Sequence, residues 1–106
     1  FCGGPFTVLT YMIEGGTSEN HQKVKTKIKK EKNELLEIIE ILVEFSSMYL
    51  IEQIKSGANI VKIFESWAGL LDNELYSDFI IKPNKKILEN IKMVFPDIPV
   101  ACFPRI

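Results

Sequence analysis

The sequence predicts an α/β fold made of consecutive β-α-β-α-β units. Three short apolar runs are strand-like, at residues 1–4, 60–64 and 98–103. Between them, residues 33–56 and 74–94 repeat apolar side chains every three or four positions, as amphipathic helices do. Strands joined by helical crossovers of this length run parallel, with the helices outside the sheet.

The start of the chain is interpreted as a strand end that passes into a short helix. Gly3, Gly4 and Pro5 allow a turn or a close backbone approach before an apolar segment that ends near Tyr11. Residues 14–20 are expected to form a loop, because paired glycines with small hydroxyl and amide side chains favour turns.

Residues 21–32 contain six lysines and one glutamate, with Val24 and Ile28 as the apolar anchors. We interpret this segment as a solvated amphipathic helix, because binding to nucleic acid or anionic lipid would favour interleaved arginine or aromatic residues. His21 is the single histidine of the sequence, which indicates an exposed loop or helix start and not a metal ligand.

The clearest helix is expected over residues 33–56, with Asn33 as its N-cap and Gly57 as the residue that ends it. Its apolar stripe is broad, which indicates packing against a sheet and against neighbouring helices. Met48 and Tyr49 are therefore expected in the core. The stripe consists of Leu35, Leu36, Ile38, Ile39, Leu42, Val43, Phe45, Tyr49, Leu50 and Ile54.

The organisation centres on residues 60–69, where a β-branched strand leads into the cluster Phe-Glu-Ser-Trp-Ala-Gly. We expect a buried parallel strand here, and side chains at the carboxyl end of such a strand often form binding or catalytic sites. The helix that follows is expected to begin with Asp72 or Asn73 as its N-cap. Pro83 should kink or interrupt it near Lys82.

The composition fits one globular domain or part of one, with 106 residues and 46% hydrophobic side chains. A net charge of -1 gives no basic field of the kind that nucleic-acid-binding proteins show. No apolar run reaches membrane-spanning length, so no membrane association is expected. Cys2 and Cys102 lack metal-ligand spacing, which favours a reduced, cytoplasmic setting over a disulfide.

Both ends of the sequence look cut. The chain begins at Phe1 without a methionine and stops directly after a strand-like run. We therefore expect a fragment of a larger protein.

Two stretches carry a family resemblance. Residues 1–16 read F-C-G-G-P-F-T-V-L-T-Y-M-I-E-G-G, and residues 64–69 read F-E-S-W-A-G. The first resembles the G-F-A-G-A-P-[FW]-T-x-x-T-Y-M-[VI]-E-G-G signature of the uroporphyrinogen decarboxylase family, and the second resembles its F-[DE]-S-[WH]-A-G segment. The similarity continues through residues 76–83 and 100–105. Cys2 and Gly4 stand where alanine is usual, which should disturb little.

The resemblance implies a (β/α)8 TIM barrel, of which residues 1–106 would be the central part, without its N- and C-terminal parts. It also implies decarboxylation of the four acetate side chains of uroporphyrinogen III to methyl groups, which gives coproporphyrinogen III in haem biosynthesis. No metal and no cofactor are expected, because a protonated pyrrole can serve as the electron sink. The implied parent is a homodimer with a tetrapyrrole substrate.

The resemblance also implies a set of site residues. Tyr11 matches the family's active-site tyrosine, whose phenol is a hydrogen-bond donor near the reacting carboxylate. Ser66 matches a serine that binds a substrate carboxylate, and Phe64 and Phe1 match phenylalanines that line the cleft. Without the resemblance, Tyr11 would be interpreted as a buried helix tyrosine and Ser66 as a loop or capping serine. Phe64 would be interpreted as a core residue.

Several expected parts of that machinery have no counterpart in this sequence. These are the family's amino-terminal arginine motif, its essential aspartate and its carboxy-terminal histidine; Arg105 is the single arginine and matches none of them. The 106-residue chain alone is therefore predicted to be inactive. One alternative is a remnant or structural core that self-associates without catalysis. Another is a cobalamin-dependent methyltransferase of the same superfamily, which would use His and Cys zinc ligands that this stretch lacks.

Overall fold

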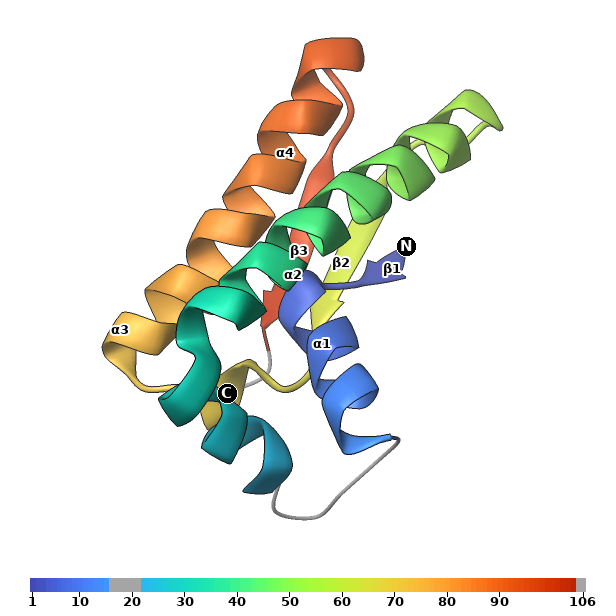
Figure 1. Cartoon of the computed structure of the whole chain (residues 1–106). Coiled ribbons are helices and arrows are strands. Elements are labelled where there is room, and N and C mark those ends of the chain that lie inside the picture. The colour runs from blue at the N-terminus through green and yellow to red at the C-terminus, as the bar shows by residue number, and fades with distance from the viewer. Residues whose placement is uncertain (16–21, 105–106) are drawn as a thin grey trace.

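The computed structural model describes residues 1–15 and 22–104 as a three-stranded parallel sheet with helices across one face (Figure 1). The strands are β1 (Cys2–Gly3), β2 (Val61–Glu65) and β3 (Val100–Pro104), in the order β1-β2-β3. Ile63 lies opposite Cys2 on one side and opposite Cys102 on the other. The predicted β-α-β-α-β order and the parallel direction are confirmed.

Helix α1 (Pro5–Glu14) follows β1 directly, as expected. Proline suits its first position, because the backbone N–H that it lacks would have no partner inside the helix. Gly15 ends the helix with a left-handed φ of 73°, and its N–H donates to the carbonyl of Tyr11. Most of the predicted loop, with His21, lies outside the described residues.

Helix α2 (Gln22–Lys55) joins the lysine-rich segment and the long apolar helix into one element. Its backbone leaves helical geometry at Glu31, where φ is -133° and ψ is 39°. The expectation of an N-cap at Asn33 is wrong, because this residue lies within the helix beyond that break. Val24 and Ile28 are buried as predicted, and buried residues lie on both sides of the break.

The broad apolar stripe of α2 is only partly covered. Its inner edge is buried, but Met48 and Tyr49 are 61% and 59% exposed, so their expected place in the core is wrong for this chain. Ile41 and Phe45 on the same flank are also largely exposed. No described element covers this flank. The buried residues are Leu35, Ile39, Val43, Leu50 and Ile54.

The path from β2 to β3 is helical throughout most of its length. It consists of the short helix η1 (Ala68–Leu70), α3 (Asn73–Tyr76), the π-helical turn η2 (Ser77–Ile81) and α4 (Lys82–Val94). Asp72 Oδ1 accepts the Leu75 N–H at 3.2 Å, which confirms the predicted N-cap. The sequence predicted a kink or interruption near Pro83. The structure has a π-helical turn directly before α4, so the helical path changes its hydrogen-bond spacing there and is not broken.

The core lies between the helices and the face of the sheet that they cover. Phe6 of α1 and Phe79 of η2 are fully buried and meet edge to face, with ring centroids 5.8 Å apart. Val61 and Ile63 of β2 complete the contact with the sheet. Among the described helices, none has both the length and the apolar character needed to cross a membrane.

Candidate functional site

Strand β2 presents its two faces to different surroundings. Val61, Ile63 and Glu65 are buried under the helices, whereas Lys62 and Phe64 are exposed on the opposite face. The sequence predicted a buried strand, but burial holds for one face only, because no described element covers the other. The open face is where Phe64 lies.

Three phenylalanines form a row across this open face. Phe64 stacks on Phe103 with ring centroids 5.4 Å apart, and it meets Phe1 edge to face at 6.1 Å. The strand register explains the row, because Phe64 lies opposite Gly3 and opposite Phe103. Phe1 is 72% exposed, Phe64 is 38% exposed and Phe103 is 48% exposed. Together they form an accessible apolar surface.

Tyr11 and Ser66 lie at the same end of the sheet. Helix α1 starts from the carboxyl end of β1, and Ser66 and Trp67 follow the carboxyl end of β2 (Figure 1). The Tyr11 ring meets the Trp67 ring edge to face, with centroids 6.1 Å apart. Tyr11 is 39% exposed and Ser66 is half-buried, so both side chains border solvent. The structure therefore brings Tyr11 to Trp67, the residue after Ser66, and brings Phe1 to Phe64, in two separate ring contacts.

Glu65 is a fully buried carboxylate between β2 and the helices. Its Oε1 accepts the Thr7 N–H at 2.9 Å, and its Oε2 accepts the Phe6 N–H at 3.4 Å and Asn84 Nδ2–H at 2.9 Å. Burial raises the pKa of this carboxyl above its ordinary value, and the hydrogen bonds from Asn84, Thr7 and Phe6 oppose that shift.

The surroundings of Glu65 are shaped to hold it. Asn84 Nδ2 also donates to the carbonyl of Ile80 at 2.8 Å, which fixes the amide with its donor toward the carboxylate. Gly4 is buried, and a Cβ at this position would lie 2.1 Å from Glu65 Cδ. Glycine thus leaves the space that the carboxylate occupies, and an alanine here would require the carboxylate to shift.

Sequence reasoning missed Glu65 and Phe103 as candidate residues. Glu65 could have been found from the alternation of buried and exposed positions along β2. It occupies the same face of the strand as Val61 and Ile63, which are apolar. Phe103 could not, because its place beside Phe64 depends on the register between two strands.

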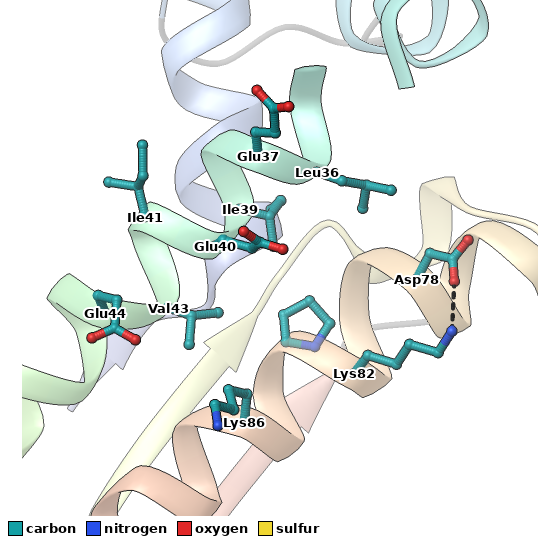
Figure 2. Close-up of a pocket in the computed structure, with 11 residues that line it drawn as sticks. Leu36, Glu37, Ile39, Glu40, Ile41, Val43, Glu44, Asp78, Lys82 and Lys86 are labelled. Atoms are coloured by element: carbon teal, nitrogen blue, oxygen red, sulfur yellow. Dashed lines mark hydrogen bonds and ion pairs between the residues drawn. The ribbon is translucent and has the colours of Figure 1, made fainter. Parts of the chain in front are cut away.

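A separate groove lies between α2 and α4 on the helical side (Figure 2). It measures about 700 Å³. The three carboxylates of Glu37, Glu40 and Glu44 come from α2, and Lys82 and Lys86 come from α4. None of the candidate residues at the end of β2 lines this groove, so it is separate from the candidate site.

The described residues offer no evident metal centre. Across residues 1–15 and 22–104, no three His, Cys, Asp or Glu side chains gather closely enough to hold a metal ion. Cys2 and Cys102 are free thiols, and burial raises the pKa of both.

The fold is that of an α/β protein with a parallel sheet, a class in which functional side chains are often carried by the loops that follow the strands. The family model for uroporphyrinogen decarboxylase (URO-D) matches residues 1–106. This chain belongs to the uroporphyrinogen decarboxylase family.

Curated relatives agree with this assignment. The chain is 47% identical to the uroporphyrinogen decarboxylase of Rickettsia bellii (strain RML369-C) over 105 residues, which cover 99% of this chain and 31% of that protein. It is 43% identical to the enzyme of Campylobacter concisus (strain 13826), also over 99% of this chain and 31% of the relative. The enzyme of a Wolbachia from Brugia malayi is 43% identical, with 29% of its length covered. The chain thus spans about 30% of the length of these relatives and corresponds to a part of such an enzyme.

Proposed function

We propose that this chain is the part of a uroporphyrinogen decarboxylase that supplies Tyr11, Ser66 and a phenylalanine wall to the substrate cleft. The observation that supports the proposal is that the two family motifs contact each other in the fold. Tyr11 of the first motif contacts Trp67 of the second, and Phe64 of the second contacts Phe1 of the first. Residues more than fifty positions apart in the sequence thus form one surface.

The proposed reaction converts each acetate side chain to a methyl group and releases carbon dioxide. The bond between the methylene carbon and the carboxylate breaks, and its electron pair moves into a protonated pyrrole ring. A proton then adds to the methylene carbon and the ring releases its own extra proton, so that each decarboxylation consumes one proton per carbon dioxide. The chain's residues would bind, orient and deliver protons, without a metal or cofactor.

Each proposed site residue has a distinct task. The Tyr11 hydroxyl, as a neutral phenol, would donate a hydrogen bond near the reacting carboxylate. The Ser66 hydroxyl would bind a second carboxylate of the same substrate. Phe64, Phe1 and Phe103 would lie along the macrocycle, where apolar contact is favourable and does not compete with the charged side chains for the carboxylates.

We also propose that the sheet continues into a (β/α)8 barrel. Parallel sheets are normally covered on both faces, yet the Phe64 face is open, and β1 and β3 are both edge strands here. The exposed flank of α2 with Phe45 and Met48 suits a neighbouring helix of the same barrel. The cytoplasmic location and the homodimer stay predictions from the resemblance.

The direct test is the reaction itself. The full-length protein that carries this chain is expected to convert uroporphyrinogen III to coproporphyrinogen III with no added metal or cofactor. The 106-residue chain alone is expected to yield none, because the family's arginine motif, aspartate and histidine are not in its sequence. Chromatography of the oxidised porphyrins measures both. A full-length protein without this activity, in chelator-treated buffer and under anaerobic conditions, would contradict the proposal.

Ser66→Ala in the full-length enzyme is expected to raise KM about tenfold or more with a smaller change in kcat. A hydrogen bond to a charged group contributes about 1.5–3 kcal/mol, and about 1.4 kcal/mol corresponds to a factor of ten. Steady-state kinetics measures the effect. Ser56→Ala is a matched control, because Ser56 is exposed beyond the opposite end of β2. Equal KM values for both variants would remove Ser66 from the site.

A further inference from the structure

Glu65 is a buried ionisable residue that the proposed chemistry does not use directly. It is 0% exposed and belongs to the helix-facing side of β2, where its companions are Val61 and Ile63. A carboxylate at such a position is retained only where donors compensate for the lost water. Its role must therefore be sought in the groups that it binds.

Two of its three donors are the first free N–H groups of α1. The N–H groups of Phe6 and Thr7 belong to the first turn, where no helical partner exists for them. A negative charge at this end of a helix is also favoured by the helix dipole. Glu65 therefore caps α1 from a strand that lies more than fifty residues further along the chain.

The third donor comes from α4. Asn84 Nδ2 reaches Glu65 Oε2 at 2.9 Å and is held in that orientation by the Ile80 carbonyl. One carboxylate thus joins α1, β2 and α4. A backbone hydrogen bond from Gly4 N–H to the Phe64 carbonyl, at 2.8 Å, lies beside this junction.

The junction lies between the two polar residues of the proposed site. Thr7 precedes Tyr11 by four positions, which is about one helical turn, so a rotation or shift of the first turn moves the Tyr11 ring with it. On the strand side, Glu65 directly precedes Ser66. The Glu65 side chain faces the helices, opposite to Phe64, so it does not itself border the open face.

We propose that Glu65 is a positioning residue, whose carboxylate holds the first turn of α1 against the end of β2 and thereby fixes Tyr11 relative to Ser66. The importance of Tyr11 and Ser66 rests on the proposed function, but the hydrogen bonds that Glu65 accepts do not depend on it. A displacement of about 1 Å can lower a rate by about 10²-fold when reacting groups must be aligned.

The junction can be tested without substrate. Full-length Glu65→Gln keeps one acceptor oxygen and replaces the other with an NH2 group, which cannot accept a hydrogen bond. The amide hydrogen of Phe6 or of Thr7, whichever faces the NH2 group, should therefore exchange about tenfold faster. The Val8 N–H, which donates to the Gly4 carbonyl at 3.0 Å, should keep its exchange rate. Unchanged exchange at both Phe6 and Thr7 would overturn the proposal, whatever the enzyme's activity.

Kinetics then distinguishes positioning from stability alone. We expect Glu65→Gln to lower kcat about tenfold with little change in KM, and Glu65→Asp, which keeps the charged acceptor, to retain most of the activity. In a Tyr11→Phe background, Glu65→Gln should lower kcat no further, because the residue that it positions is already disabled. Fully additive effects on kcat would overturn the proposal.

Two further variants cover the case in which Glu65→Gln does not fold. Asn84→Ala removes one donor to the carboxylate, and we expect it to lower kcat several-fold, with the same lack of additivity toward Tyr11→Phe. Ile91→Val is the matched control, because it loosens the buried face of α4 about two helical turns from Asn84 and should leave kcat unchanged. Equal kcat values for Asn84→Ala and Ile91→Val would count against positioning. If the wild-type enzyme does not decarboxylate uroporphyrinogen, the proposed function fails, and the exchange experiment still decides on the junction.

Discussion

Full-length Tyr11→Phe is expected to turn over uroporphyrinogen about 10²-fold more slowly than the wild type, with a small change in KM. The substitution removes only the hydroxyl, and a positioned proton donor contributes at least about 10²-fold to such reactions. The ring should keep its place, because its edge-to-face contact with Trp67, at 6.1 Å, does not involve the hydroxyl. Single-turnover and steady-state kinetics measure the effect.

Tyr49→Phe is the matched control for this prediction. Tyr49 is largely exposed on the flank of α2, far along the chain from both family motifs, and its hydroxyl has no proposed role. It should turn over substrate at the wild-type rate. A Tyr11→Phe enzyme within about twofold of the wild type in kcat would exclude the hydroxyl from the chemistry.

Phe79→Ala is expected to lower the free energy of unfolding by about 3–5 kcal/mol, the typical cost of removing a buried phenylalanine. Phe79 is fully buried in η2 and packs edge to face on Phe6, so the truncation leaves a cavity directly under α1. Denaturant unfolding of the full-length enzyme measures the change.

Two comparisons make the Phe79 prediction specific. Met93→Ala, at a largely exposed position of α4, should change the free energy of unfolding by at most about 0.5 kcal/mol. A double-mutant cycle of Phe6→Leu and Phe79→Leu should give a coupling of about 0.5–1.5 kcal/mol, as expected for two aromatic rings in contact. An equal cost for Phe79→Ala and Met93→Ala would show that this ring does not belong to the core of the enzyme.

The elements that the sequence predicted well are those specified by local patterns. Local patterns of this kind depend on residues only a few positions apart. Examples are the apolar spacing of α2, the N-cap at Asp72 and the glycine after α2. The predictions that were wrong depend on which surface meets a partner. Asn33 has a capping side chain but lies within the second part of α2, beyond the break at Glu31, and Tyr49 continues an apolar stripe but is 59% exposed.

The candidate site divides in the same way. The choice of Tyr11, Ser66, Phe64 and Phe1 comes from family motifs that match them residue by residue, and their roles stay predictions. Their arrangement could not be predicted from local patterns, because the contacts of Tyr11 with Trp67 and of Phe64 with Phe103 depend on strand register and on the start of α1.

The sequence by itself determined the order of strands and helices and the membership in the uroporphyrinogen decarboxylase family. Both follow from residue types at fixed spacings, which are readable without knowing any long-range contact. Only the tertiary structure decided that Glu65 is a buried carboxylate that joins α1, β2 and α4, and not a surface charge. Its carboxylate is stabilised by N–H groups of Phe6 and Thr7 and by the amide of Asn84, and these donors converge only when α1, β2 and α4 pack together.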